Sequence, residues 1–507
     1  MSFLETYNKN IEIKISLISI AIVGLILRLY YFPYDLPLFA DGLDNFTYAT
    51  AINYYNHLPN EWSPANNGWP IFLSFWFSLF RFENTFEYMQ LQKIISVILS
   101  ITTIVPIYLL CRKFFDKKLA LIGSALFIFD PRIILNSTLG ITEPLFILLG
   151  ISSLLIFLRY DRKSIVFAFI FASFATIVRS EGIFLLITLA ILFIIKYKIS
   201  KEIFKTFIPA LVLFMLILTP IMIYKTEVSG HDGIFERAVY GTGEIINISN
   251  QKDKNELISG IELFMKYLGW IMIPTFLFFV PLGLFLFLKN RKKETYFIIV
   301  FLISSSLPIL YACIVQAQDT RYFYFLYPIF CLISLFGVEF YLKKINKNSN
   351  IIILLLIIGI FSSSVIFYEY KKIDFEKERE WNDISKIISS KISGTNFHPD
   401  MTKYIRDKEI PKEWPFLFNE MYRVNSIPMN SYNNIVEYIQ ESRSTISHLV
   451  ISDNLELPKF LIDVYHNESK YSFLEKEFDS EQMGFKNGVK LFKIDFQKFD
   501  LFVNDNK

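Results

Sequence analysis

The sequence has few of the residues that build metal sites, disulfide frameworks or charged surfaces. Its 507 residues include three cysteines and five histidines, and charged residues make up 20% of the chain. The cysteines, Cys111, Cys313 and Cys331, lie in or beside apolar runs, so no disulfide framework and no Cys-x-x-Cys metal site is available. The formal net charge of +3 is too small to indicate a nucleic-acid partner. We therefore predict no nucleic-acid partner.

What the chain has in excess is apolar side chains. Hydrophobic residues make up 53% of the sequence and aromatic residues 17%, and the mean hydropathy is +0.39. A soluble globular protein carries roughly 45–50% apolar and about 25% charged residues. Since a spanning helix needs about 20 apolar residues, the length allows about eleven spans and one further domain. The apolar runs that predict these spans are Ile15–Phe32, Ile94–Leu110, Leu119–Ile134, Glu143–Leu158, Ser164–Val178, Gly182–Ile195, Phe207–Tyr224, Tyr267–Leu288, Tyr296–Val315, Phe323–Leu342 and Ile351–Tyr368.

The distribution of basic residues predicts the orientation of these spans. The first run ends in Arg28-Leu-Tyr-Tyr-Phe rather than in a small-residue cleavage site, so we expect it to remain as a span. Lys and Arg gather in alternate connections, for example at 112–118, 159–163 and 289–293. The positive-inside rule then predicts a cytoplasmic N-terminus, and an odd number of spans puts the tail outside. We expect a multi-pass protein of the cell membrane.

The composition changes abruptly after residue 368. Residues 1–368 are predicted to form the transmembrane bundle, with a large first outer loop at 33–93, and residues 369–507 an extracytoplasmic domain. In the tail, His448–Ile451 and Val489–Phe496 read as strands, and Glu376–Ser390 and Tyr432–Gln440 as helices. The predicted fold class is therefore a polytopic α-helical membrane bundle followed by a small α/β domain.

The first outer loop contains a pair of aspartates without a basic neighbour in the sequence. Asp41 and Asp44 are three residues apart, so a helix beginning here would present both carboxylates on one face. No Lys or Arg occurs between Arg28 and Arg81. The alternative interpretation is structural: Asp44 caps a helix and the nearby aromatic residues form an interfacial belt.

Further charged residues fall at the same predicted face of the membrane. Glu143 opens the fourth span, Arg179 and Glu181 lie between the fifth and sixth, and Arg321 precedes the tenth. Each has a structural alternative: an acidic helix start, a local ion pair, and an arginine whose charge reaches the interface. Because several separate loops bring such groups to one face, and because ionisable residues are costly in hydrocarbon, we favour a functional site.

At these residues the chain resembles a known family, the GT-C membrane glycosyltransferases. The similarity is to the dolichyl-phosphate-mannose protein mannosyltransferases and their bacterial aminoarabinose-transferase relatives, over about residues 15–370. The family places an Arg at the end of the first span, matched by Arg28, and an Asp-Glu-x-x-Tyr pattern in the first outer loop. The match to that pattern is Asp44-Asn-Phe-Thr-Tyr48, with Asn45 in place of Glu, so the principal carboxylate is either Asp44 or Asp41. The Thr-Glu143-Pro, Arg179-Ser-Glu181-Gly and Arg321-Tyr322 stretches also look like family features.

The resemblance implies transfer of a sugar from a polyprenyl-phosphate donor to an acceptor hydroxyl, with inversion. Such a reaction needs a base for the acceptor proton and cations for the departing phosphate. We assign Asp44 or Asp41 as the base and Glu143 to orient the sugar or acceptor. Arg179 and Arg321 are assigned to the donor phosphate. Arg28, Tyr48, Glu181 and Tyr322 are expected to support the site.

The expected partners are the lipid-linked donor, an acceptor protein, lipid or glycan, and the surrounding membrane lipids. No cofactor is expected, although Asp41, Asp44 and Glu143 could supply oxygen ligands to a divalent cation, as in the related oligosaccharyltransferases. A transporter or lipid flippase is the main alternative, and a non-catalytic scaffold is a third. Against a transporter, the charges gather at one face, no inverted repeat is visible, and a sizeable domain follows the last span.

Overall fold

The computed structural model describes residues 3–505 apart from 61–62, 83, 199–200, 237–253, 291, 318, 346–348, 372, 374, 392–431, 433, 444–445 and 454–457. The chain divides into two compact units. The bundle unit comprises Met1–Phe32, Asp44–Arg81 and Leu91–Ile373. The C-terminal unit comprises Asp374–Lys507 together with Pro33–Leu43 and Phe82–Gln90. The second unit therefore includes two pieces of the first outer loop in addition to the tail.

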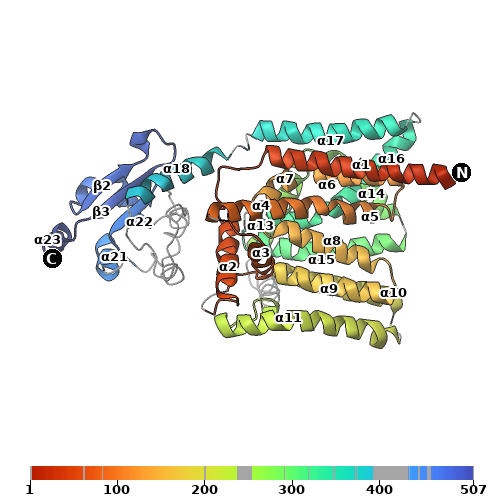
Figure 1. Cartoon of the computed structure of the whole chain (residues 1–507), viewed down its shortest axis with the longest axis horizontal. Coiled ribbons are helices and arrows are strands. Elements are labelled where there is room, and N and C mark those ends of the chain that lie inside the picture. Colours follow the sequence, from red (N-terminus) through yellow and green to blue (C-terminus); the bar gives the residue numbers. More distant parts are fainter. Residues whose placement is uncertain are drawn as a thin grey trace. The chain divides into compact units, whose positions relative to one another are not determined.

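The bundle unit is built from helices (Figure 1). Short helical turns precede three of them, namely η1 (Ser180–Gly182), η2 (Ile203–Phe207) and η3 (Thr320–Leu326). Two helices, α2 and α4, begin in segments of the C-terminal unit and continue in the bundle unit. The helices are α1 (Phe3–Tyr30), α2 (Asp41–Tyr55), α3 (Gly68–Leu79), α4 (Thr85–Thr102), α5 (Ile104–Cys111), α6 (Lys117–Ile128), α7 (Pro131–Thr138), α8 (Glu143–Phe157), α9 (Arg162–Val178), α10 (Ile183–Tyr197), α11 (Ile208–Ser229), α13 (Lys254–Ile271), α14 (Phe276–Lys289), α15 (Lys293–Ile314), α16 (Tyr327–Ile345) and α17 (Ser349–Lys371).

The apolar runs predicted as spans are helical but unequal in length. In the described part of the chain, seven helices are long and apolar enough to cross a membrane. Two bent pairs, α6 with α7 and α13 with α14, raise that number to as many as nine. The runs Glu143–Leu158 and Ser164–Val178 correspond to the shorter helices α8 and α9, which pack against each other. The predicted count of about eleven is larger because it includes these two short helices.

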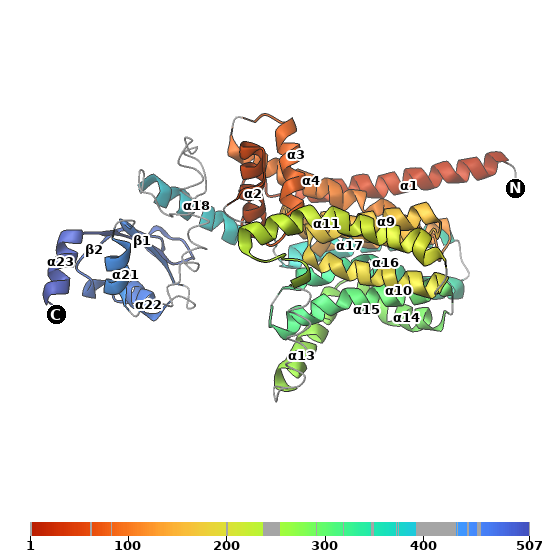
Figure 2. The same cartoon turned by 90° about the horizontal axis from the view of Figure 1, so that it is seen from below.

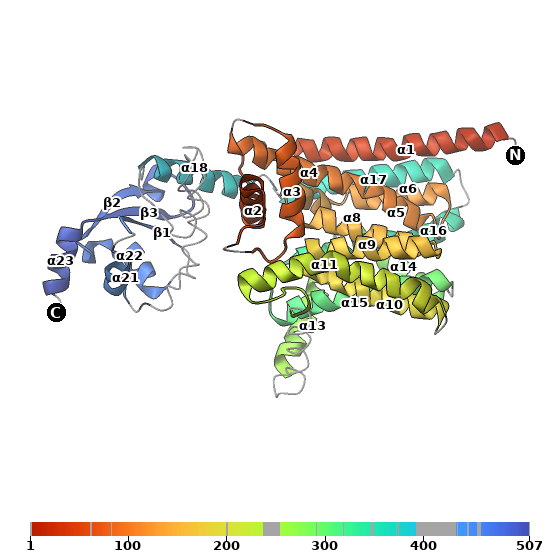
Figure 3. The ribbon, with the colours of Figure 1, turned by 60° about the horizontal axis from the view of Figure 1, so that its bottom comes forward.

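Aspartate caps fix where several of these helices begin. Asp116 accepts hydrogen bonds from the first backbone N–H groups of α6, Asp130 from those of α7, and Asp161 from that of Ser164 in α9. Helices α8, α9, α10 and α11 run side by side (Figure 3), and α15 packs against α10 (Figure 2). Because α8 and α9 are consecutive and antiparallel, the start of α8 and the end of α9 lie at one end of the bundle unit.

Arg28 is fully buried and joins four helices. Its guanidinium donates to the carbonyl of Gly24 within α1, to Ser100 Oγ of α4, to the Ile128 carbonyl of α6 and to Ser137 Oγ of α7, at 2.9–3.1 Å. A guanidinium can be buried when its N–H groups have hydrogen-bond acceptors. Four acceptors contact the guanidinium of Arg28. The described contacts of Arg28 are therefore structural, and it does not line the candidate site described below.

Glycine allows two helices of the bundle unit to approach closely. A Cβ at Gly283 of α14 would lie 2.2 Å from the backbone carbonyl oxygen of Ile333 in α16. A Cβ at Gly337 of α16 would lie 2.9 Å from the carbonyl oxygen of Phe279 in α14. Small residues that let backbones touch are a common basis of helix packing in membranes.

The C-terminal unit contains a three-stranded antiparallel sheet in the order β1-β3-β2. Its strands are β1 (His448–Ser452), β2 (Leu474–Asp479) and β3 (Val489–Ile494). Two apolar clusters pack on it, one containing Ile384 and Ile388 of α18. The helices are α18 (Glu376–Lys391), α21 (Ile435–Ser442), α22 (Lys459–His466) and α23 (Phe496–Asp505). The predicted polytopic helical bundle with a small α/β domain is confirmed.

Details of this domain differ from the sequence prediction. β3 ends at Ile494 and Phe496 begins α23, because Asp495 accepts hydrogen bonds from the N–H groups of Gln497 and Lys498 and starts the helix. α21 begins at Ile435, three residues after Tyr432, where Asn434 caps it. β2 was missed because three consecutive charged residues, 475–477, interrupt any apolar pattern. The pieces of the first loop join this unit through the Asp35–Arg379 ion pair and the bond from Gln90 to the Leu36 carbonyl.

We predict that Gly283→Ala lowers the thermal stability of the detergent-purified chain, because the added methyl group must push α14 away from the α16 backbone. The loss should be in the range of about 1–3 kcal/mol found for overpacked cores. The matched control is Gly359→Ala in α17, where a Cβ meets nothing within 4 Å. That variant should be neutral or slightly stabilised, since Ala favours helix over Gly. Equal melting temperatures for the two variants would contradict the proposed close contact.

Candidate functional site

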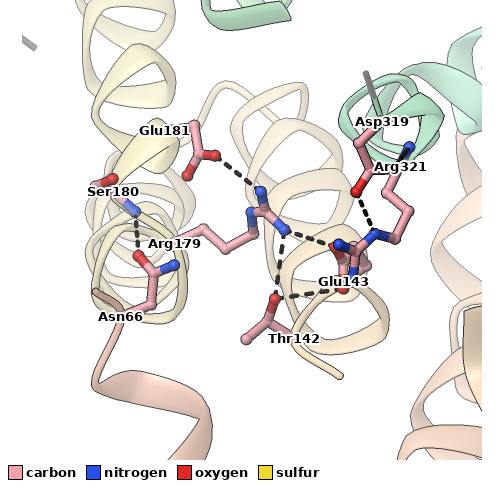
Figure 4. Close-up of polar contacts among 8 residues, drawn as sticks. All are labelled: Asn66, Thr142, Glu143, Arg179, Ser180, Glu181, Asp319 and Arg321. Carbon is pink, nitrogen blue, oxygen red and sulfur yellow. Dashed lines mark hydrogen bonds and ion pairs between the residues drawn. The ribbon is translucent and has the colours of Figure 1, made fainter. Parts of the chain in front are cut away.

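An arginine between two carboxylates forms the centre of the candidate site (Figure 4). Nη1 of Arg179 lies 2.7 Å from Oε1 of Glu143, and Nη2 lies 2.8 Å from Oε1 of Glu181. Nη1 also lies 3.4 Å from Thr142 Oγ1. The side chains of Glu143 and Arg179 are 6% and 14% exposed, so their ion pair is largely withdrawn from water, whereas Glu181 is 25% exposed. We call Glu143, Arg179 and Glu181 the arginine–carboxylate cluster.

Local chain geometry explains why these three side chains meet. Arg179 is the first residue after α9 and has extended backbone angles, and η1 follows immediately with Glu181. Gly182 closes this turn against α9, since a Cβ there would lie 2.6 Å from backbone atoms of Thr176. The backbone N–H of Ser180 donates to Asn66 Oδ1 at 3.1 Å, which ties the turn to the first outer loop (Figure 4).

Arg321 and Tyr322 approach the cluster from η3. Asp319 caps η3 by accepting from the Arg321 backbone N–H, and its other oxygen lies 2.6 Å from Arg321 Nε. The Arg321 and Asp319 side chains are each 31% exposed, so this pair is more open to solvent than the Arg179–Glu143 pair, and Glu181 at 25% is intermediate. The ring of Tyr322 lies 5.6 Å from the guanidinium carbon of Arg179, within cation–π range.

These groups line one wall of a small cavity in the bundle unit. Its polar wall contains Glu143, Arg179, Glu181, Arg321 and Tyr322, and the rest is mainly apolar, with Phe146, Phe184 and Phe325. The volume is about 30 Å³, which leaves room for about one or two water molecules. The space is too narrow for a phosphate group as it stands, so a phosphate-bearing ligand needs side chains to move.

The two aspartates of the first loop are not part of the arginine–carboxylate cluster. Asp41 is the first residue of α2 and Asp44 lies one turn further, and both are exposed. Asp41 belongs to the C-terminal unit and Asp44 to the bundle unit. Asp44 does not line the cavity. Of the predicted site residues, the structure thus brings together Glu143, Arg179, Glu181, Arg321 and Tyr322.

Tyr48 lies in a separate polar network that sequence reasoning did not identify. Its hydroxyl is 2.6 Å from that of Tyr224 in α11 and accepts from Asn67 Nδ2 at 3.3 Å. Lys225, the next residue of α11, is buried and donates to the carbonyls of Pro64 and Ala65 at 3.1 and 2.8 Å. These contacts hold the loop that presents Asn66. The sequence feature that could have indicated this network is Lys225, a basic residue that follows the apolar part of α11.

The donor groups of this site fit a metal ion poorly. Among the residues that the structure describes, no group of three or more His, Cys, Asp or Glu side chains is placed to hold one. The carboxylate of Glu143, one of the three candidate ligands, is already bound to Arg179. A cation would have to compete with that guanidinium for the same oxygen atoms.

Comparison with known proteins supports the similarity inferred from the motifs. Residues 70–224 match the family model described as dolichyl-phosphate-mannose-protein mannosyltransferase. No curated protein sequence matches the chain.

Solved structures with a similar fold include two GT-C enzymes. The oligosaccharyltransferase AglB of Archaeoglobus fulgidus, solved with an inhibitory peptide and a dolichol-phosphate, gives a TM-score of 0.57 at 14% identity, over 91% of this chain and 71% of AglB. The same AglB with zinc and sulfate gives 0.52 at 14% identity, and there the match spans only 57% of the AglB chain. ArnT of Cupriavidus metallidurans, bound to undecaprenyl phosphate, gives 0.53 at 10% identity, over 94% of this chain and 97% of ArnT.

Identities this low establish the fold and leave the chemistry to be argued from the site. The chain is a polytopic helical membrane protein with the fold of the GT-C glycosyltransferases, and its predicted resemblance to their mannosyltransferase and ArnT-like group is confirmed.

Proposed function

We propose that this protein is an integral membrane glycosyltransferase that moves a sugar from a polyprenyl-phosphate donor to an acceptor hydroxyl. The observation that carries the proposal is the arginine–carboxylate cluster beside a mainly apolar cavity, in a bundle with the GT-C fold. Polar groups that bind a phosphate and an apolar wall that contacts an isoprenoid chain are the two features such a donor needs. The family match over residues 70–224 supports the same class.

The proposed orientation puts the site at the outer face of the cell membrane. The basic residues where α8 ends and α9 begins, Arg159, Arg162 and Lys163, lie at the opposite end of α8 and α9 from Glu143 and Arg179. With these residues inside, by the positive-inside rule, the site is extracytoplasmic and the N-terminus is cytoplasmic. An odd number of spans then places the C-terminal unit outside as well.

The balance of charge suggests how a donor would bind. The charged residues that line the cavity are two carboxylates and two guanidinium groups, and Asp319 adds a further negative charge beside Arg321. A donor phosphate must therefore replace a carboxylate at one arginine. The partly exposed Arg321–Asp319 contact is the cheaper one to open, because such pairs are worth about 0–1 kcal/mol. We assign Arg321 the first contact with the phosphate, while Arg179 holds Glu143 and Glu181 in place and joins as the cavity opens.

The proposed chemistry is a single displacement at the anomeric carbon. The acceptor oxygen bonds to that carbon as the bond to the phosphate oxygen breaks, so the configuration inverts. The acceptor proton passes to a carboxylate, for which Asp44 and Asp41 are the candidates, and the polyprenyl phosphate leaves with the electron pair. Glu143 would orient the sugar or acceptor. No metal ion is required, because the arginines can stabilise the leaving phosphate.

The printed ligands of the similar structures guide the choice of donor. AglB was solved with a dolichol-phosphate and a peptide, and ArnT with undecaprenyl phosphate. We propose a polyprenyl-phosphate-linked sugar as donor and a protein, lipid or glycan as acceptor. Purified protein in vesicles, supplied with labelled donors of this class, should form glycosylated product. Translocation of the lipid without sugar transfer would instead identify a flippase.

We predict that Arg321→Gln raises the donor KM by about 10- to 100-fold, the effect of losing a hydrogen bond to a charged group worth about 1.5–3 kcal/mol. The matched control is Arg162→Gln, which removes an ion pair of similar length with Glu202 on an exposed surface. Initial rates against donor concentration measure the effect. If both variants keep the wild-type KM, Arg321 does not bind the phosphate.

We also predict that one of Asp41→Asn and Asp44→Asn lowers the rate of transfer by about 10²- to 10⁴-fold, the usual contribution of a general base. The donor KM should change little, because the carboxylate acts on the acceptor and not on the donor. Asp35→Asn, in the same loop but ion-paired with Arg379, serves as the control. Full transfer by both variants would remove the aspartates from the mechanism.

A further inference from the structure

A second and larger cleft opens in the bundle unit between α5, α8 and α9. It has a volume of about 560 Å³, against about 30 Å³ for the candidate site. Its apolar wall contains Val105, Leu109, Leu155, Ile156 and Phe171. Three basic residues, Arg112, Lys113 and Arg159, complete the lining. We call this feature the basic cleft.

The cleft is separate from the candidate site. Along α8, Ile156 lies thirteen residues after Glu143, or about 20 Å at 1.5 Å per residue. That distance is about two thirds of the hydrocarbon thickness of a bilayer. The two features therefore open near opposite ends of the same helix, and the donor phosphate assigned to one cannot also contact the other.

The three cations of the cleft keep their charges available. Arg112 donates to the Phe115 carbonyl at 2.5 Å and Lys113 to the Leu158 carbonyl at 3.2 Å, and neither contact neutralises a charge. No acidic side chain is among the described residues that line the cleft. The nearest acid to Arg159 in sequence, Asp161, interacts with it electrostatically, but the hydrogen bonds of Asp161 are made at the start of α9, where it accepts from the Ser164 N–H and hydroxyl.

The apolar wall favours a lipid over a free anion. Two of its residues, Val105 and Leu109, are 47% and 42% exposed, so this wall has an open apolar surface. In a membrane that surface faces acyl chains, while the cations at the helix ends lie at the level of the head groups. Basic pockets between transmembrane helices are suited to anionic head groups.

We propose that the basic cleft binds an anionic glycerophospholipid, with its phosphate on Arg112, Lys113 and Arg159 and the beginning of an acyl chain against Leu155, Ile156 and Phe171. The lipid fills the gap between α5, α8 and α9, and its negatively charged phosphate offsets part of the positive charge of the three basic residues. It acts at the end of α8 opposite Glu143, and this role does not depend on the proposed transfer reaction.

The test uses the full chain, purified in detergent and stripped of lipid, with thermal unfolding followed in mixed micelles. Phosphatidylglycerol should raise the melting temperature of the wild type and phosphatidylcholine should not. Each Lys or Arg near an anionic surface contributes roughly fivefold in affinity. The double variant Arg112→Gln with Arg159→Gln should therefore need roughly 25-fold more phosphatidylglycerol for half of the maximal rise in melting temperature. The matched control, Lys343→Gln with Lys344→Gln, removes two basic residues of α16 that do not line the cleft.

A second variant guards against misfolding of the first. Ser152→Phe adds bulk inside the cleft and leaves every charge in place, and it should also weaken the response to phosphatidylglycerol. Equal responses to the two phospholipids, or an equal loss in the control variant, would overturn the proposal. Stabilisation by glycerol 3-phosphate alone would also overturn it, because the cleft would then be a site for a free phosphate.

Discussion

The arrangement of the candidate site depends on the cost of leaving a charge unpaired in an apolar bundle. Arg179 is only 14% exposed, and its guanidinium has a carboxylate on each side. Removing one partner of such a buried pair costs several kcal/mol, because the other charge is left uncompensated. The start of α8, the end of α9 and the turn η1 are therefore fixed to one another by the requirement that Arg179 keep both partners. Tyr322 and the loop around Asn66 are then placed around this fixed point.

Two buried arginines show how much of the candidate site could be predicted from the sequence. Arg28 and Arg179 both stand at the end of an apolar run, and the motif resemblance assigned both to the site. The structure gives them different partners: hydroxyl and carbonyl groups of four helices for Arg28, and carboxylates for Arg179. Which residues meet a guanidinium depends on how helices pack over long sequence separations, and periodicity carries no information on that. The placement of rare charges at one face was accessible from the sequence, whereas the assignment of their partners was not.

The fold was predictable to a similar degree. Long apolar runs identify helices because hydrocarbon leaves the backbone few alternatives, and all the predicted runs are mainly helical, with breaks in Leu119–Ile134 and Tyr267–Leu288. The number of full spans was harder, since α8 and α9 bury much of their surface in protein and can be short. In the C-terminal unit the apolar strands β1 and β3 were recognised, but β2 carries charged residues on its exposed positions and is held by pairing with β3. Its formation reflects backbone hydrogen bonds to a neighbouring strand, which leave no trace in its own pattern.

The narrow cavity has a consequence for the fate of an activated sugar. A glycosyl phosphate can react with water as well as with an acceptor hydroxyl, and water is far more abundant. A site of about 30 Å³ holds about one or two water molecules before a donor arrives, and a mainly apolar wall gives further water few partners. A donor that opens such a site also fills it, so bulk solvent has little room to follow. On the proposed function, the limited room for water therefore protects the donor from hydrolysis, and selectivity for the acceptor over water begins before the acceptor binds.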